Sequence, residues 1–149
     1  MTFTMTIGDM ELSPFTARSS RELYCIRNHG SVRSFMANPE LIPYRAHRAW
    51  VQKHLIDGTD LLLFLVRPKA GARAIGFTQL ILRDDTAEIG VVFRDAVRHH
   101  ASAALATVAT LHLAFCHLKL AGLVSYVLPA HQAARAFNMA FGAQEVPTD

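Results

Sequence analysis

Residues 87–93 read Ala-Glu-Ile-Gly-Val-Val-Phe, and residues 98–103 read Arg-His-His-Ala-Ser-Ala. The first stretch is apolar and rich in β-branched residues, which predicts a strand. The second opens a run of 20 residues without formal charge, between Arg98 and Lys119, which predicts a long helix from about His99 to Leu118. With a further strand at 122–128, these segments form a strand–helix–strand crossover, the unit that places two parallel strands in one sheet.

The uncharged run is long enough to span a membrane, but its composition favours a soluble helix. Alanine dominates it, and it holds four histidines, one serine and two threonines, which are costly in hydrocarbon. Leu105, Val108, Leu111 and Phe115 recur at helical spacing. We therefore expect the helix to pack these side chains against a sheet and not to cross a membrane.

Outward from this unit, apolar runs and turn signals divide the rest of the chain. Gly30 is expected to end the first helix, and Asp84-Asp85 to form a tight turn between two strands. The predicted order is β-α-α-β-β-β-α-β-α-β, a mixed, mostly antiparallel sheet flanked by helices, in one α/β domain of the α+β type over residues 1–149. Strands are predicted at 10–15, 61–66, 74–82, 87–93, 122–128 and from 142 to 146, and helical segments at 20–28, 32–36, 43–55, 99–118 and 131–141.

The composition describes a folded protein, because 51% of residues are hydrophobic and only 18% are charged. Cys25 and Cys116 are too few for a disulfide framework and form no metal-binding motif, so we expect reduced thiols in the core. The first residues lack the features of a secretory signal, and with the reduced thiols this favours a cytoplasmic setting.

Positive charge gathers in the N-terminal third. Seven Lys and Arg residues lie between Arg18 and Lys53, against Glu22 and Glu40. Such a surface can attract an anionic ligand, but it can equally be a solvated helix face or bind an acidic partner protein. A nucleic-acid partner is not expected, because no recognition motif accompanies the charge.

These elements resemble, over nearly the whole chain, the Gcn5-related N-acetyltransferase superfamily. Residues 87–93 resemble its fourth strand, and residues 98–103 occupy the slot of its Q/R-x-x-G-x-G/A phosphate loop. Residues 118–123 resemble its helix-to-strand junction, and residues 131–142 its N-x-x-[SA]-x-x-[LF]-Y-x-x-x-G segment. The resemblance implies an N-acetyltransferase that uses acetyl-CoA.

In this family the cofactor lies along a splayed strand and its pyrophosphate meets a helix start, where unpaired N–H groups and the helix dipole favour anions. The alternative is a helix start that carries solvated basic residues. The resemblance implies Val91, Val92 and Phe93 as partners of the pantetheine amides; Arg98, His99, His100, Ala101, Ser102 and Ala103 as the phosphate site; and His131 where the family usually has Asn.

The resemblance also implies catalytic positions. Glu88 corresponds to the general base of some relatives, although it can also be an exposed polar residue of a strand. Tyr126 is placed like a proton donor, although it can also be a core tyrosine. Asn138 stands where many members carry a tyrosine that protonates the CoA thiolate, a role that asparagine cannot fill. Together with Ala101 and His131, Asn138 leaves a CoA-binding or sugar-nucleotide-binding module without turnover as an alternative.

Residues 26–29, 32–36 and 41–50 are similar to acetyltransferases of UDP-linked 4-amino sugars, of the kind that precede pseudaminic acid. This similarity implies a small amine acceptor, an anionic nucleotide sugar. Ribosomal-protein and antibiotic acetyltransferases share parts of the pattern, so their acceptors stay open. We also expect the closing strand to be short, so that a second subunit can cover the exposed sheet edge. The acceptor residues implied are Arg27 and Arg33 for the diphosphate and Asn28 and His47 for sugar hydroxyls.

Overall fold

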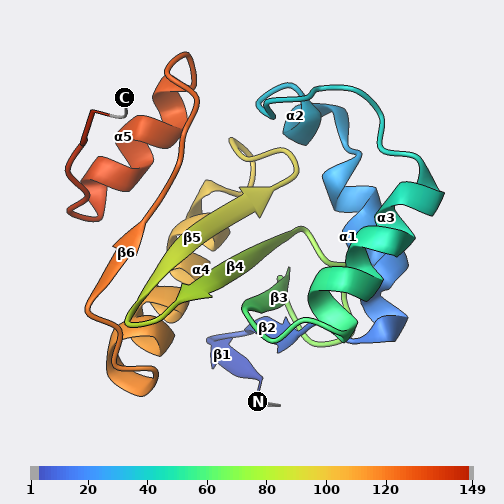
Figure 1. Ribbon diagram of the computed structural model, residues 1–149, viewed down its shortest axis with the longest axis horizontal. Helices are drawn as coiled ribbons and strands as arrows, with labels where there is room; N and C mark the ends of the chain where they lie inside the picture. Colours follow the sequence, from blue (N-terminus) through green and yellow to red (C-terminus); the bar gives the residue numbers. More distant parts are fainter. Residues whose placement is uncertain (1–3, 148–149) are drawn as a thin grey trace.

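A computed structural model describes residues 4–147 of the chain, and its ribbon is shown in Figure 1. The strands are β1 (Met5–Ile7), β2 (Met10–Pro14), β3 (Leu61–Arg67), β4 (Gly76–Arg83), β5 (Thr86–Phe93) and β6 (Gly122–Val124). The helices are η1 (Ala17–Ser19), α1 (Ser20–Arg27), α2 (Gly30–Arg33), α3 (Tyr44–Val51) with the π-helical turn η2 (Gln52–Ile56), α4 (His100–His112) with the π-helical turn η3 (Leu113–His117), and α5 (Gln132–Ala140). From β2 to α5, the strands and helices follow one another in the order that the sequence predicts.

The strands form one six-stranded sheet in the order β1-β2-β3-β4-β5-β6. Neighbours from β1 to β5 are antiparallel, whereas β5 and β6 are parallel and are joined through α4. Asp84 has a φ of 51°, and it lies in the tight turn between β4 and β5 that the sequence predicts. The mixed, mostly antiparallel sheet flanked by helices is confirmed.

Two hydrophobic clusters cover the two faces of this sheet, because side chains alternate along each strand. Along β5, Ile89, Val91 and Phe93 face α4, while Val92 faces α1, α2 and α3. In Figure 1 α4 lies behind the sheet, α1 and α3 lie to the right of it, and α5 lies beside β6. Glu88 and Gly90 therefore share the face of Val92, which is the face turned toward α1 and α2.

The α4 helix packs against the sheet through small side chains and not through the large ones that its periodicity suggests. Ala106 and Thr110 are fully buried, whereas Leu105, Val108 and Phe115 are about half exposed. The expectation about the packed face is therefore wrong, because alanines and threonines let the helix axis approach the sheet more closely than leucines would. Among residues 4–147 no helix is both long and apolar enough to cross a bilayer.

Three further expectations about local structure are wrong. Gly30 does not end a helix; it begins α2, while α1 already ends at Arg27. Cys25 and Cys116 are exposed free thiols and not core residues, because their helices turn them away from the sheet. The N-terminal strand β1, which pairs with β2, was not expected.

The C-terminal part holds less strand than predicted. β6 stops at Val124, and residues 125–128 and 142–146 form no strand among the described residues. Pairing with β5 is limited to three residues, which leaves the predicted strand without a partner along most of its length. The second subunit that would cover this edge stays a prediction.

Candidate functional site

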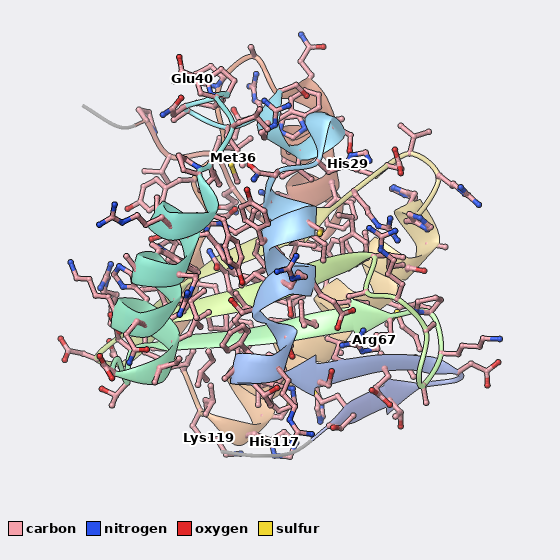
Figure 2. The ribbon with its side chains drawn as sticks, turned by 90° about the vertical axis from the view of Figure 1, so that its right-hand side faces the viewer. His29, Met36, Glu40, Arg67, His117 and Lys119 are labelled. Carbon is pink, nitrogen blue, oxygen red and sulfur yellow. The ribbon has the colours of Figure 1, made fainter. Side chains whose placement is uncertain are left out.

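A cleft of about 2480 Å³ opens between β5, the segment after β6, α5 and the loop between α2 and α3. Figure 2 shows Met36 and Glu40, which belong to that loop and line the cleft, at the opposite end of the molecule from His117 and Lys119. The cleft brings together residues that the sequence analysis selected from distant segments. They are Arg27, Glu88, Val91, Val92, Phe93, Arg98, Tyr126, His131 and Asn138.

The cleft exists because β5 and β6 separate. Their parallel pairing runs from Thr86 with Gly122 to Glu88 with Val124 and ends there. On its other side β5 remains paired with β4 as far as Phe93. Peptide groups of residues 89–93 therefore face the cleft without a strand partner, and they offer donors and acceptors to amides of a bound ligand.

The N-terminus of α4 lies at one end of this open edge. His99 is the N-cap residue, and the Ala103 amide donates to the His99 carbonyl at 2.9 Å. The amides of residues 100–102 precede that bond, so the helix itself provides no acceptor for them. Arg98 lines the cleft beside these amides, which makes this end suited to an anion.

The other predicted phosphate-site residues occupy ordinary helical positions. Ala101 is not among the described residues with positive φ, so its backbone does not require glycine. His100 lies on α4, its ring 5.8 Å from the ring of Phe137 on α5. Ser102 is half-buried, and Ala103 is buried against the sheet. Among these loop residues Arg98 is the one whose side chain lines the cleft.

Glu88 stands in the middle of the cleft wall. It is half-buried and lies on the same face of β5 as Gly90 and Val92. Beside it on β4 is Gln79, which pairs with Gly90 in the sheet and also lines the cleft. A Cβ on Gly90 would come within 3.1 Å of the Gln79 side chain, so the missing side chain makes room for that amide.

Gln79 is a cleft residue that the sequence analysis missed. The signal was present, because Gln79 follows Thr78 as one of two polar residues in the apolar stretch Gly-Phe-Thr-Gln-Leu-Ile-Leu. Its carboxamide can donate and accept hydrogen bonds directly next to Glu88.

Tyr126 and Asn138 lie on the opposite wall. The Tyr126 side chain is 69% exposed and follows the end of β6, so it is not a core tyrosine. The Asn138 amide on α5 donates a hydrogen bond of 3.1 Å to the Ser125 hydroxyl. This bond ties α5 to the segment after β6, in which Tyr126 also lines the cleft.

The acceptor residues divide into one that lines the cleft and three that do not. Arg27 lines it, and its guanidinium lies 4.2 Å from the ring centroid of Trp50. Burial lowers the pKa of Arg27 from its ordinary value, which still leaves the group charged near neutral pH.

His47 is fully buried and contacts the Arg27 guanidinium. Its Nδ1 lies 2.9 Å from Nη1 of Arg27, and its Nε2 lies 2.9 Å from the Ser20 carbonyl oxygen. Both ring nitrogens are thus satisfied inside the protein. This placement does not fit direct contact between His47 and a sugar hydroxyl.

Asn28 and Arg33 hold the loop that borders the cleft. The Asn28 side chain donates to the Ile42 carbonyl at 2.9 Å and accepts from the Ile42 amide at 2.8 Å. Arg33 donates through Nε to the Asn28 carbonyl at 2.9 Å and through Nη1 to the Pro39 carbonyl at 2.8 Å. Their hydrogen-bonding groups serve the loop, which explains their spacing without a ligand.

Two stacked aromatic rings, those of Phe35 and His131, line the cleft. Phe35, just after α2, lies 3.9 Å from the ring of His131 with an interplanar angle of 10°. Burial lowers the pKa of His131, which favours the neutral ring. The stack joins the loop on the acceptor side to the N-terminus of α5, so both walls meet here.

The comparisons with known proteins agree with this geometry. A search of the curated proteins finds no sequence match. A proposed ribosomal-protein-serine acetyltransferase from Vibrio cholerae has a similar structure, with a TM-score of 0.79 at 18% identity over 99% of this chain and 87% of that one. A spermidine N-acetyltransferase from Vibrio cholerae in complex with CoA and spermine gives 0.74 at 18% identity, over 91% and 80%.

A probable GNAT-family acetyltransferase from Chromobacterium violaceum gives a TM-score of 0.73 at 20% identity, over 93% of this chain and 76% of that one. At these identities the structures establish a shared fold. The sequence adds the decisive match, because residues 9–144 fit the family model described as an acetyltransferase (GNAT) domain. Because this match covers most of the chain, the chain belongs to the GNAT acetyltransferase family, whose members are acyltransferases that use acetyl-CoA.

Proposed function

We propose that this protein transfers the acetyl group of acetyl-CoA to the primary amine of a small anionic acceptor, a nucleotide-linked amino sugar, within the cleft of β5 and α5. The observation that carries the proposal is the order of groups along that cleft. Arg98 just before the start of α4, an open strand edge, a carboxylate at Glu88 and a guanidinium at Arg27 all line it. This order suits a long phosphorylated donor at one end and an anionic acceptor at the other.

On the donor side, the amides at the start of α4 and Arg98 bind the pyrophosphate, and the free edge of β5 pairs with the pantetheine amides. The thioester then lies near Gly90, beside the Gln79 amide that occupies the space of the missing side chain. The site thus fixes donor and acceptor next to each other, which alone lowers the barrier by several kcal/mol.

On the acceptor side, Glu88 takes a proton from the ammonium group, directly or through one water, so that the amine can attack. The new N–C bond forms as the C–S bond breaks; the nitrogen then gives up its second proton, and the departing thiolate takes one up. Tyr126 is the group that supplies this proton, since Asn138 has none to give and is bonded to Ser125.

Arg27 favours an anionic acceptor over a cationic one. It is the predicted acceptor-binding residue that lines the cleft, and no carboxylate pairs with it among residues 4–147. A guanidinium held by stacking and by His47 can bind a phosphate with little loss of side-chain entropy.

The experiment is a CoA-thiol release assay with acetyl-CoA and a panel of acceptors: a UDP-linked 4-amino sugar, spermidine, an aminoglycoside and a peptide with a free N-terminus. We expect release well above the acceptor-free rate with the UDP sugar. Preferred turnover of another acceptor would contradict the acceptor class and retain the acetyltransferase activity. Tight acetyl-CoA binding without turnover of any acceptor would instead favour the binding module that Ala101, His131 and Asn138 suggest.

A further inference from the structure

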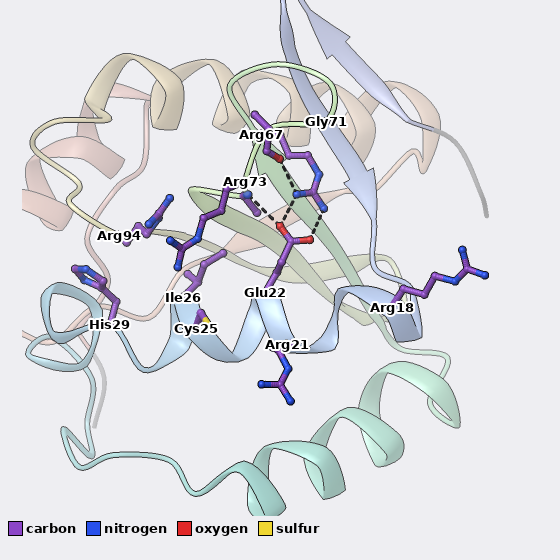
Figure 3. A pocket seen from close by; sticks show the side chains of 12 residues that line it. Arg18, Arg21, Glu22, Cys25, Ile26, His29, Arg67, Gly71, Arg73 and Arg94 are labelled. Carbon is purple, nitrogen blue, oxygen red and sulfur yellow. Dashed lines mark hydrogen bonds and ion pairs between the residues drawn. The ribbon is translucent and has the colours of Figure 1, made fainter.

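A second pocket, of about 770 Å³, lies between α1, the end of β3 and the loop that joins β3 to β4 (Figure 3). It shares no lining residue with the acetyl-CoA cleft. Arg94, directly after β5, lines this pocket, whereas the next residue, Asp95, lines the cleft. The two cavities are therefore separate.

The pocket carries a large excess of positive charge. Its lining includes Arg18, Arg21, Arg67, Arg73 and Arg94, against one carboxylate. Four of these arginines, all except Arg67, have no ion pair within residues 4–147. Arg18 and Arg21 point away from the others, the Arg21 guanidinium lying over the Tyr44 ring, but Arg73 and Arg94 lie on one side of the pocket (Figure 3). Like charges gathered in this way repel one another and attract a multivalent anion.

The single carboxylate, Glu22, offsets only one of these charges, because it is bonded to Arg67. Glu22 accepts two hydrogen bonds from Arg67, one of them at 2.8 Å, and a third from the Ala74 amide at 3.1 Å. Figure 3 shows this pair at the centre of the pocket, while Arg73 and Arg94 lie on the side toward His29. Asp95, which follows Arg94, has its Oδ2 at 3.9 Å from Nε2 of His29.

Arg94 supplies an independent sign of a missing partner. Its Nε is buried and has no hydrogen-bond acceptor in the described part of the chain. A buried donor of a charged group that lacks an acceptor costs free energy, and proteins satisfy nearly all such groups. An anion in the pocket would provide the acceptor.

We propose that this pocket binds a diphosphate group of a small molecule, at a site distinct from that of acetyl-CoA. Two guanidinium groups can each hold one phosphate in a bidentate manner. The pocket volume lies in the usual range for small-molecule sites, so a nucleoside attached to the diphosphate also fits. This proposal does not depend on the acceptor argued above.

The test is calorimetric titration with inorganic pyrophosphate in the presence of saturating acetyl-CoA. The parent should bind, and Arg73→Ala and Arg94→Gln should each weaken binding about tenfold or more, the loss expected for a charged hydrogen bond. Arg83→Ala is the matched control, because Arg83 is an exposed arginine outside both cavities. ADP and adenosine separate the two sources of the group: ADP tighter than pyrophosphate indicates a nucleotide, equal affinity indicates a free diphosphate, and adenosine should not bind.

Several results would overturn the proposal. One is equal binding by the parent, Arg73→Ala and Arg94→Gln. Another is an equal loss in Arg83→Ala, which would mean unspecific attraction. A third is displacement of pyrophosphate by acetyl-CoA together with loss in Arg98→Ala, which would place the anion in the cleft. Arg73 is exposed, so its variant should fold even if Arg94→Gln does not.

The two exposed thiols provide a second readout on the unmodified protein. Cys25 lines the pocket and Cys116 does not. ADP should slow alkylation of Cys25 by iodoacetamide several-fold by covering it, with Cys116 as the internal control. Equal rates at Cys25 with and without ADP, measured on the separated peptides, would contradict the site.

Discussion

Nη1 of Arg27 lies 2.9 Å from Nδ1 of the buried His47. An arginine can only donate, so Nδ1 must accept and the His47 proton must lie on Nε2. That proton is donated to the Ser20 carbonyl, 2.9 Å away. The neutral ring of His47 therefore positions the guanidinium that faces the cleft, and a protonated ring would place two cations in contact.

This arrangement predicts that stability depends on pH. Burial, with a further contribution from the charge of Arg27, lowers the pKa of His47, although its bond to Ser20 opposes this. The unfolded chain then binds more protons than the folded one as the pH falls below about 6.5. We expect the free energy of unfolding to drop there by up to about 1.4 kcal/mol per pH unit, until the pH reaches the lower pKa of the folded state.

The measurement is urea unfolding between pH 5 and pH 8, for the parent and for His47→Gln. The variant should be less stable at pH 8 but less sensitive to acid. Parallel pH profiles for the two proteins would show that His47 is not the group that titrates. His131, whose pKa burial also lowers, contributes with the same sign and is unchanged in both.

Replacement of Arg27 should affect the acceptor and not the donor. In Arg27→Ala we expect KM for a UDP-amino sugar to rise about tenfold or more, because a charged hydrogen bond of ground-state binding is lost. KM for acetyl-CoA should stay within about twofold, since Arg98 and the start of α4 are intact. Arg45→Ala, an exposed arginine on α3, is the control and should resemble the parent. Equal effects on both substrates would contradict an acceptor role.

The contact between α4 and β4 predicts a non-additive pair of mutations. The Thr110 hydroxyl donates to Thr78 Oγ1 at 2.9 Å and lies 2.8 Å from the Ala106 carbonyl, and both threonines are fully buried. Thr110→Val should cost about 1–3 kcal/mol, because the Thr78 hydroxyl remains buried without its partner. Thr78→Val/Thr110→Val should recover much of that loss. A double variant that loses the sum of the single effects would show that the hydroxyls do not interact.

The sequence predicts the sheet well because alternation along β3, β4 and β5 is a local signal. It fails for α4, where Leu105 and Val108 share a helical stripe but alanines make the contact with the sheet. Periodicity records where large side chains recur, whereas close packing of a helix on a sheet selects small ones. The sequence also did not predict that β6 is short, since its length depends on how far β5 remains paired with it.

The sequence also predicted only part of the candidate site. Glu88, Arg98 and Arg27 line the cleft, and their positions follow from the element order. Asn28 and Arg33 were interpreted as ligand-binding residues, yet they bind backbone atoms of their own loop, up to residue 42. A polar side chain in a loop carries the same residue type whether it serves a ligand or the backbone. The arginine pocket was invisible because its members are spread from residue 18 to residue 94.

The last prediction concerns the proton transfer from the acceptor. Glu88 is the acidic residue on the part of β5 that lines the cleft, and Gln79 lies beside it as a neutral neighbour. Glu88→Gln keeps the shape of the side chain but removes the base, so the acceptor amine stays protonated near neutral pH. We expect kcat to fall about 10²-fold or more, with partial recovery at higher pH where the free amine becomes abundant.

A thiol has a pKa near 8.5, so a thiolate leaves readily without a strong acid. Tyr126→Phe should therefore cost less than Glu88→Gln, and Asn138→Tyr should not lower activity. Gln79→Ala is the control for the shape of the wall: it removes a cleft side chain without removing a base. The measurement is the pH–rate profile of the parent and these four variants. An unchanged acidic limb at full activity in Glu88→Gln would make Glu88 a structural residue of β5, and the base would then be water or another group.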